Sequence, residues 1–487
     1  MLNKILNFFF RRGRGEKVDN ITSSSFENGF GIYDQRAQVN EWINIYEGNP
    51  SWLNDKVKKS LNIGALVASD LARLATIEFE SSVSGKGVED VNLWYQTVVD
   101  NMRRIMEFTI VQGGLALKPY IENDSIYTEV IPGDEFVPLK FDGAGNVTSA
   151  VFIYKTTQGR DKFTRLEFHG FDDDNRYVVT NKAFRSRGGK EYGQEVDLTL
   201  IDEWAHLESE AILDVNRPLF VYLTTPYANN KDIKSPLGVS VFTKIGHLLE
   251  DADRQWANID MEYEKKKVRI MLSNNMVPFM GDMSEMSDDI DDIKELFILF
   301  ENEESRIDVF SPEIRDRSMF ARLEEIKRMI EFSAGLAYGS LSKVDNVEKT
   351  AEEIRSGKER SFNTVRDMQK SLKKALSELV EVLIIMGQEA DLVGEVDYEI
   401  TFYFDDSIVI DEMSDITLMY QEVKDGVLKP EYYISRRYGI TMDEARKRMG
   451  KLFSDEPEVR NEKIEEKEDI IDNNDSNIDN DDKNDED

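Results

Sequence analysis

Cysteine is absent from all 487 residues of the chain. Its absence excludes disulfide bonds, thiol nucleophiles, zinc fingers and iron–sulfur ligation. Histidine is nearly absent as well, because only His169, His206 and His247 occur, far apart in the sequence. A multi-histidine metal site would need a fold that brings these distant positions together. We therefore interpret His169 and His206 as structural residues and predict no metal centre and no cofactor.

The chain also lacks a long hydrophobic run. No stretch approaches the roughly 20 apolar residues that cross a bilayer. The apolar run at the amino terminus precedes most of its charge, which is the reverse of a secretory signal. We interpret this run as a frayed or partner-docking terminus, with a short amphipathic membrane tether as the alternative. We expect a soluble protein made in a cytosol, without a membrane partner.

Basic side chains are outnumbered, since 61 lysines and arginines stand against 95 aspartates and glutamates, for a formal net charge of −34. Affinity for phosphates comes from basic side chains that release counterions, so this composition argues against a general DNA-binding protein. The 40% apolar content is sufficient for a sizeable core, and about 150 residues per domain suggests about three structural units. The acidic segment 454–487 is the exception, and we predict that it is disordered.

Catalytic signatures are missing too. The Gly85-Lys86 and Gly189-Lys190 pairs lack the other residues of a phosphate-binding P-loop, and neither Gly-x-Ser-x-Gly nor His-Glu-x-x-His occurs. The aspartate clusters in 172–174 and 289–292 lack regular ligand spacing, so we interpret them as a hairpin turn and a solvated face rather than divalent-ion sites. The sequence thus predicts no catalytic residue and no enzyme.

Hydrophobic periodicity predicts an α+β fold. Helical spacing of apolar residues predicts helices over 35–115, and strand-like runs over 115–185 predict an antiparallel sheet of meander type. Three long helices are predicted next. The first has about thirty residues over 239–270, with Ser235-Pro236 as its start signal, and the other two cover about 312–334 and 348–388. The remaining elements are a strand or buried turn at 296–300, a strand at 395–404 and small helices at 412–425 and 430–451.

The first two long helices are only half apolar. The stripe on the first is too polar for a core helix, and the helix is too long to stand free, so we expect it to pack against copies of itself or a partner. That stripe consists of Phe242, Ile245, Leu249, Trp256, Ile259 and Tyr263, and one face of the second helix carries Phe320, Leu323, Ile326, Met329 and Ile330.

Several short segments follow one another in an informative order. They are Asn216-Arg-Pro-Leu-Phe-Val-Tyr, Pro226-Tyr-Ala-Asn-Asn, Ser235-Pro-Leu-Gly-Val-Ser, a helix that ends Lys265-Lys-Lys-Val-Arg-Ile, then Pro312-Glu-Ile-Arg, Gly335-Leu-Ala-Tyr-Gly-Ser-Leu-Ser and Lys349-Thr-Ala-Glu-Glu-Ile. Over about 40–450 the chain closely resembles the portal proteins of tailed bacteriophages, in the branch typical of long-tailed phages of Gram-positive hosts. Its last helix-rich part is short for a large crown, and we expect no counterpart for the acidic tail.

The resemblance implies a ring, usually of twelve subunits, at one vertex of the capsid. The large subunit of the terminase would pump double-stranded DNA through this ring without sequence specificity, and the head–tail connector would later dock to it. Major capsid and scaffolding proteins are further implied partners. The protein would reside in the virion after assembly in the host cytoplasm, and it would not be an enzyme.

The same resemblance divides the chain into the parts of a portal subunit. The wing would comprise 1–237 and 348–410, the stem helices 238–268 and 312–334, the clip 269–311, the tunnel loop 335–347, the crown 411–453 and the disordered acidic tail 454–487.

Three groups of residues carry the functional hypotheses. In the channel, Lys265, Lys266, Lys267, Arg269 and Lys343 would make weak phosphate contacts; the alternative for the lysine run is an outward face or pairing with acids such as Glu262 and Glu264. The tunnel loop would include Gly335, Gly339, Ser342, Val344, Asp345 and Asn346. In the clip, Phe279, Met280, Met283 and Met286 would form an adaptable partner-binding surface, although core packing or ring contacts would explain the same residues.

Two other classes of protein share some of these features. An acidic helical scaffold or adaptor would have the charge and the long helices but no reason to form a channel. A phage nuclease or motor subunit would need a metal–carboxylate cluster or a P-loop, and the sequence shows neither.

Overall fold

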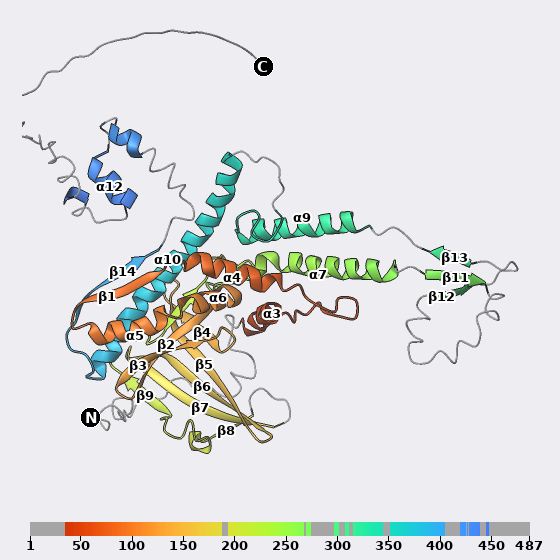
Figure 1. The fold of residues 1–487 in the computed structure, drawn as a ribbon. Helices are drawn as coiled ribbons and strands as arrows, with labels where there is room; N and C mark the ends of the chain where they lie inside the picture. The colour runs from red at the N-terminus through yellow and green to blue at the C-terminus, as the bar shows by residue number, and fades with distance from the viewer. Residues whose placement is uncertain are drawn as a thin grey trace, which may run out of the picture. The chain divides into compact units, whose positions relative to one another are not determined.

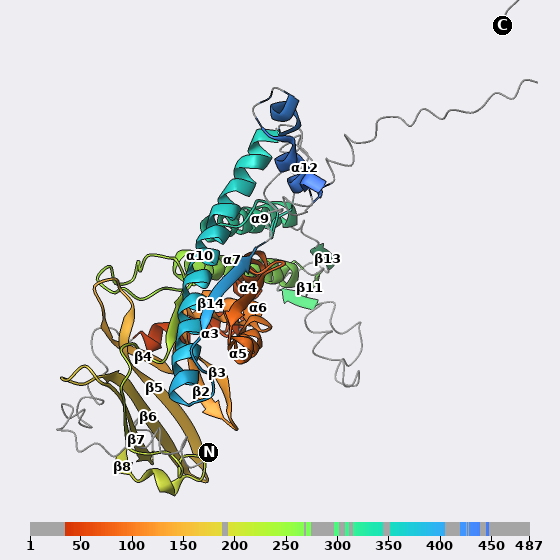
Figure 2. The same ribbon diagram turned by 90° about the vertical axis from the view of Figure 1, so that its left-hand side faces the viewer.

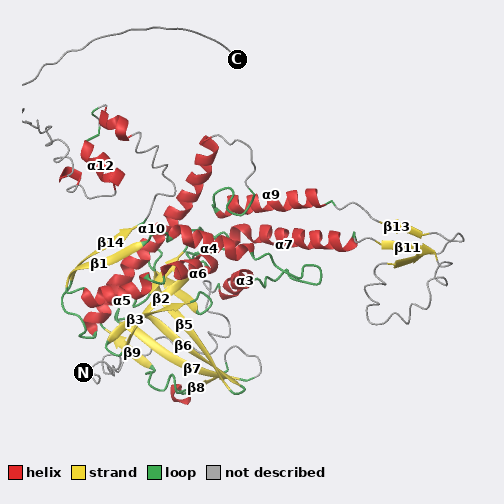
Figure 3. Cartoon of the chain, viewed as in Figure 1, coloured by secondary structure: helices red, strands yellow, loops and turns green. Residues whose placement is uncertain are grey.

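The computed structural model describes residues 35–187, 193–266, 269–273, 297–300, 307–310, 315–343, 351–404, 419–424, 426, 428–438 and 445–447 (Figure 1). The chain divides into two compact units, Met1–Val409 and Ile410–Asp487, which are described separately. Helices alternate with mainly antiparallel strands in the first unit, which confirms the predicted α+β class (Figure 3). Among the described residues, none of the helices is long and apolar enough to cross a membrane.

The first part of the first unit is largely helical, as predicted. Its helices are α3 (Arg36–Tyr46), α4 (Ile63–Ala75), α5 (Glu89–Val99) and α6 (Met102–Gln112). The prediction is wrong at β1 (Glu80–Lys86), a strand that pairs antiparallel with β14 (Asp397–Tyr403) so that Val83 lies opposite Ile400. Its partner is more than three hundred residues away in the chain, and local periodicity carries no information on such a pairing.

The predicted meander is present over β4 (Phe136–Phe141), β5 (Val147–Gln158), β6 (Asp161–Phe171) and β7 (Tyr177–Ser186), and this sheet is extended by β8 (Gln194–Val196) and β9 (Glu210–Leu213). The hairpin of β2 (Gly114–Glu122) and β3 (Ser125–Ile131) does not continue it. These two strands form a separate sheet with β10 (Val221–Thr224), so the prediction of one continuous sheet over 115–185 is wrong there. The short strands β9 and β10 were not predicted.

Aspartate-led turns connect the meander strands. Asp142 Oδ1 accepts the backbone N–H groups of Ala144 at 2.9 Å and Asn146 at 2.8 Å. Asp172 Oδ1 accepts those of Asp174 at 3.0 Å and Arg176 at 2.8 Å. The aspartate at the start of each turn therefore satisfies backbone donors. The cluster in 172–174 forms a hairpin turn, as predicted.

The first long helix, α7 (Phe242–Lys265), begins three residues later than the predicted run at Val239 and seven residues after Ser235, where the start signal lies. The backbone before it is already engaged elsewhere, because Val241 N–H donates to the Ile110 carbonyl at 3.2 Å and the Val239 carbonyl accepts from Thr225 Oγ1 at 2.8 Å. Ser240 Oγ then accepts the Phe242 N–H at 3.1 Å and takes up one of the unpaired donors at the helix start.

The second long helix, α9 (Asp316–Ala334), runs antiparallel to α7. The Gln255 amide of α7 donates to the Met319 carbonyl at 3.0 Å, and Arg315 Nε donates to Glu262 Oε1 at 3.2 Å, so the end of α7 meets the start of α9 (Figure 1). The expectation that α7 is too polar for a core helix is wrong, because most of its predicted stripe is buried inside one subunit. In the two predicted stripes the buried residues are Phe242, Ile245, Leu249, Ile259, Leu323, Ile326 and Ile330, while Tyr263, Phe320 and Met329 are exposed.

A small sheet lies between α7 and α9 in the chain. Its strands are β11 (Arg269–Ser273), β12 (Phe297–Phe300) and β13 (Ile307–Phe310), with β11 in the middle, parallel to β12 and antiparallel to β13. The strand at 296–300 is thereby confirmed, whereas the predicted end of the first long helix at Lys265–Ile270 is wrong, since α7 stops at Lys265 and Arg269 opens a strand.

The third long helix, α10 (Ala351–Glu389), and β14 agree with the prediction. Figure 2 shows β14 alongside α10, and Lys373 Nζ of α10 lies 5.2 Å from the Phe402 ring centroid of β14. One core cluster joins α5 and α10 to β2 and β10, and a second joins α3, α4 and α6 to α7 and α9. In the second unit, α12 (Pro430–Tyr438) packs Tyr433 against Tyr420 with ring centroids 5.7 Å apart.

Candidate functional site

The helix α9 ends at Gly335, where the helix was predicted to break. Gly335 has a left-handed backbone with φ of 80°, and its N–H donates to the Glu331 carbonyl. A Cβ atom at this position would lie 2.3 Å from Thr364 Oγ1 of α10. Both the backbone conformation and the close approach of α10 require glycine here.

The segment after Gly335 folds back onto α9 and is held by one carboxylate, that of Glu331. This residue is 1% exposed. Its Oε1 accepts the backbone N–H groups of Leu341 at 2.5 Å and Ser342 at 2.7 Å. Its Oε2 accepts the Gly339 N–H at 3.2 Å and the Ser342 hydroxyl at 2.9 Å. Four donors thus converge on one buried carboxylate, which compensates for its desolvation.

A second carboxylate, that of Glu324, holds the end of the segment. Its Oε2 accepts the Lys343 N–H at 2.9 Å, and its Oε1 accepts from Lys327 Nζ at 2.8 Å. Burial alone would raise the pKa of Glu324, but the hydrogen bonds and charges of Lys327 and Lys343 outweigh it and lower that pKa. The Lys343 backbone is therefore fixed, while its side chain is exposed. We refer to residues 335–343 as the anchored loop.

Sequence reasoning identified Gly335, Gly339, Ser342 and Lys343 but missed Glu331 and Glu324. The available signal was their spacing: two glutamates seven residues apart lie on the same face of a helix, here just before a glycine-rich break. Val344, Asp345 and Asn346 lie outside the described residues.

The basic residues proposed for the channel are only partly described. Lys266 Nζ lies 3.9 Å from Glu262 Oε1, the carboxylate that also binds Arg315. Arg315 and then Lys266 lower the pKa of Glu262. Lys265 is the last residue of α7 and Arg269 the first of β11. Lys267 and the clip residues Phe279, Met280, Met283 and Met286 lie outside the described part of the chain.

A second cluster of charged side chains is buried between the meander sheet and the β2–β3 hairpin. Glu167 lies at its centre. Lys118 Nζ is 2.8 Å from Glu167 Oε1, Arg165 Nη1 is 2.5 Å from Oε2, and His169 Nε2 is 2.7 Å from Oε1. All four side chains are at most 10% exposed. Buried charges of this kind persist only when they are paired and hydrogen-bonded.

The protonation of His169 follows from its neighbours. The ionised Glu167 carboxylate can only accept, so the neutral His169 carries its proton on Nε2, and its Nδ1 accepts from the Tyr177 hydroxyl at 2.8 Å. The Tyr177 oxygen in turn accepts the Leu219 N–H at 3.1 Å. His169 then donates from Nε2 to Glu167 as a neutral imidazole. Burial lowers the pKa of His169 and outweighs Glu167, which raises it. The interpretation of His169 as a structural histidine is confirmed.

Glu167 is held in its ionised form. Burial alone would raise its pKa, but Lys118, His169 and Arg165 outweigh burial and hold the pKa well below its usual value. The Lys118 bond joins the two sheets, and the bonds of Arg165, His169 and Tyr177 hold the cluster together within the meander sheet, so we assign this cluster to stability.

The described residues thus form an anchored loop at the end of α9 and a buried charge cluster around Glu167. The chain belongs to the phage portal proteins of the SPP1 Gp6-like family, whose model matches residues 78–476. This range extends into the acidic segment, so the expectation that the tail has no counterpart is wrong up to residue 476. Portal proteins are ring-forming structural components of the virion, and the chain is therefore a virion protein that assembles with copies of itself.

Two further comparisons concern solved structures and curated proteins. A chain from the solved structure titled "Virion of native gene transfer agent (GTA) particle" is similar at 10% sequence identity and a TM-score of 0.42, covering 86% of this chain and 98% of that chain. The search of curated proteins gives no match.

Proposed function

We propose that the chain forms the ring-shaped DNA channel at one capsid vertex, through which terminase packages double-stranded DNA and to which the head–tail connector docks. Membership of the portal family supports this proposal. In this proposal the ring contains twelve subunits, contacts the major capsid and scaffolding proteins, and assembles in the host cytoplasm.

The described elements support the proposed division into parts. The antiparallel pair α7 and α9 would be the stem, and the small sheet of β11 to β13 would belong to the clip. The wing would combine residues from both sides of the stem in sequence, and the pairing of β1 with β14 links those two stretches. The crown would lie in the second unit.

The observation that carries the proposal is the anchored loop at the end of α9. It corresponds to the proposed tunnel loop, it is fixed through Glu331 and Glu324, and it leaves the Lys343 side chain exposed. One exposed lysine at this position in each subunit of a chain of net charge −34 would give a ring of weak, sequence-independent phosphate contacts. DNA could slide along such a surface without being held.

The experiment is a charge reversal, Lys343→Glu, tested in a packaging assay. We expect the variant to assemble normally and to package DNA less efficiently, because a ring of negative charge would repel the duplex. The matched control is Lys162→Glu, an equally simple reversal of an exposed lysine on β6. Unchanged packaging by the Lys343 variant would contradict the proposed role of the loop.

A further inference from the structure

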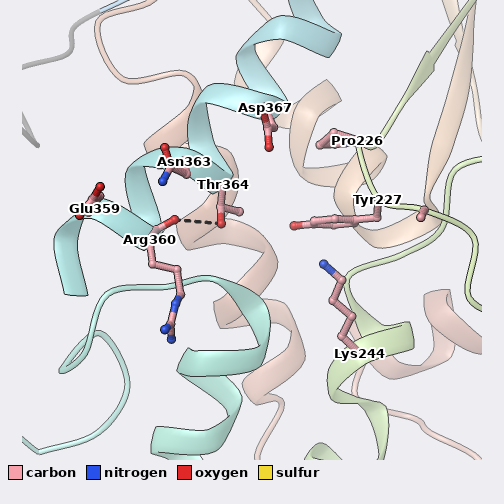
Figure 4. A pocket seen from close by; sticks show the side chains of 9 residues that line it. Pro226, Tyr227, Lys244, Glu359, Arg360, Asn363, Thr364 and Asp367 are labelled. Atoms are coloured by element: carbon pink, nitrogen blue, oxygen red, sulfur yellow. Dashed lines mark hydrogen bonds between the residues drawn. The ribbon is translucent and has the colours of Figure 1, made fainter. Parts of the chain in front are cut away.

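The sheet of β1 and β14 has only two strands, and its two edges are treated differently by the rest of the fold. The pocket between the start of α7 and the middle of α10 offers no comparable asymmetry, because two cations and two anions line it and balance one another. These residues are Lys244, Arg360, Glu359 and Asp367 (Figure 4). We therefore turn to the sheet, where backbone groups lack partners.

The outer edge of β1 is closed by side chains of α5. The Val83 N–H donates to Asn92 Oδ1 at 2.9 Å, and Gln96 Nε2 donates to the Ser81 carbonyl at 2.8 Å. These backbone groups of Val83 and Ser81 therefore point away from β14. Because their hydrogen bonds are already made, a further strand cannot pair with β1 there.

The outer edge of β14 is open. Val83 lies opposite Ile400, and Ser81 lies opposite Phe402. In an antiparallel pair, opposite residues direct their backbone groups either toward each other or both away, so those of Ile400 and Phe402 point away from β1. They make no hydrogen bond with another residue that the structure describes. Figure 1 shows β14 on the side of β1 that is away from α5.

The two faces of β14 differ in chemistry. Ile400 and Phe402 are half-buried against the core cluster of α5 and α10, so apolar side chains on an added strand would extend that core. Asp397 and Glu399 are exposed on the opposite face, where basic side chains on an added strand would be attracted. A fitting strand is therefore rich in aromatic or β-branched residues and carries positive charge.

The amino-terminal segment of the chain has this composition. Residues 1–14 contain three consecutive phenylalanines, four basic residues and no acidic residue, in a chain whose net charge is −34. The described chain begins at residue 35, so residues 15–34 connect this segment to it. Twenty residues reach up to about 66 Å when extended, which exceeds the length of about 58 Å of the 39-residue helix α10.

We propose that residues 1–14 add to the open edge of β14 of the same chain as a third strand of this sheet. The segment pairs with the free backbone groups of Ile400 and Phe402, extends the core with its phenylalanines, and places basic residues near Asp397 and Glu399. A tethered segment acts at high effective concentration, which favours the chain's own segment over that of another copy. This proposal is independent of the DNA channel, because its test does not involve packaging.

The test is hydrogen exchange of single backbone amides in the full-length protein, measured by mass spectrometry. We expect the Ile400 and Phe402 amides to be protected, although no acceptor for them lies among the described residues. In the triple variant Phe8→Ser, Phe9→Ser, Phe10→Ser they should exchange at least about tenfold faster, because the added strand loses its apolar contacts.

Two controls accompany this measurement. The Thr401 amide faces β1, so its protection should be the same in the wild type and the triple variant. Replacing the acids of β14, by Asp397→Asn with Glu399→Gln, should speed exchange at the open edge at least about threefold. The matched pair Glu122→Gln with Asp124→Asn removes two exposed acids from the β2–β3 hairpin and should leave that exchange unchanged.

Three results would overturn the proposal. Rapid exchange of the Ile400 and Phe402 amides in the wild type would show that the edge stays open. Protection that survives in the triple variant would assign the edge to a different segment. Protection that disappears on dilution would assign it to a second copy of the chain.

Discussion

Glu167 shows how a single buried residue depends on its neighbours. Removing one partner from a buried charge cluster leaves the others uncompensated, which typically costs about 3–5 kcal/mol. Lys118 comes from β2, and Arg165 and His169 come from β6, so the cluster ties the hairpin sheet to the meander sheet. Because His169 and Glu167 can take up protons, the stability of this cluster also depends on pH.

Acidification below pH 6.5, the ordinary pKa of histidine, should destabilise the folded protein. Burial depresses the pKa of His169 below 6.5 in the folded protein, so the unfolded chain takes up the proton first. The stabilisation is complete above pH 6.5 and is lost as the pH falls, by at most about 1.4 kcal/mol per pH unit. We expect His169→Gln to abolish this part of the pH dependence. Urea denaturation at pH 7.5, 6.5 and 5.5 gives the free energy of unfolding of the wild type and of His169→Gln. If this free energy falls equally with pH in both proteins, the prediction is contradicted.

A further loss of stability is expected in stronger acid. The folded-state pKa of Glu167 lies well below 4.5, so its contribution is present above that pH and lost as the pH falls below it. His169→Gln should retain most of this step, because Lys118 and Arg165 still lower the pKa of Glu167. The two residues can therefore be separated within one titration series.

Glu331 should control the order of the anchored loop. In Glu331→Gln the amide keeps one oxygen acceptor but turns an N–H₂ toward backbone donors, at a cost of about 2 kcal/mol. We expect hydrogen exchange of the Gly339, Leu341 and Ser342 amides to become roughly 30-fold faster. The control is Glu325→Gln, an exposed residue whose carboxylate lies 3.5 Å from Arg328. Equal protection in the two variants would argue against the anchor.

At the scale of single residues, the sequence predicts fewer side-chain roles than the structure shows. His169 could be assigned a structural role because it lies within a strand-like run. The role of Glu331 could not be predicted, because its partners are backbone groups of a loop whose path no side-chain pattern encodes.

At the scale of elements, Gly335 and Gly246 provide a matched pair. Gly335→Ala forces a side chain onto a left-handed backbone and against Thr364, so we expect a loss of about 2 kcal/mol. Gly246→Ala lies within α7 with no atom within 4 Å of the added Cβ, so we expect a gain of about 0.5–1 kcal/mol. Denaturant midpoints of the two variants measure both effects. A shift of the same sign in both would contradict this account of how α9 ends.

Elements with strong local signals were predicted well, and elements defined by distant partners were not. The helical periodicity of apolar residues in α10 and their alternation in β5 to β7 were sufficient to predict these elements. The start of α7 was misplaced because Ser235-Pro236 is a favourable helix start locally, while the Val239 and Val241 backbone groups pair with Thr225 and Ile110. The strand β1 was missed because it exists only as the partner of β14.

At the scale of the whole molecule, the order of short segments identified the family where composition alone did not. The charge of −34 was equally consistent with an acidic scaffold. The family model supports the portal assignment, and the anchored loop gives the proposed channel a specific point of contact. A closed ring requires two different complementary surfaces on each subunit.

The mass and shape of the assembled protein test the central claim most directly. Light scattering with negative-stain imaging, over a concentration series and with scaffolding protein added, should give a closed ring with a central hole. Its mass should be about 670 kDa, near twelve times the 56.1 kDa of one chain. An elongated dimer or a monomer at every concentration, with and without the scaffold, would contradict the portal ring and favour a scaffold or adaptor without a channel.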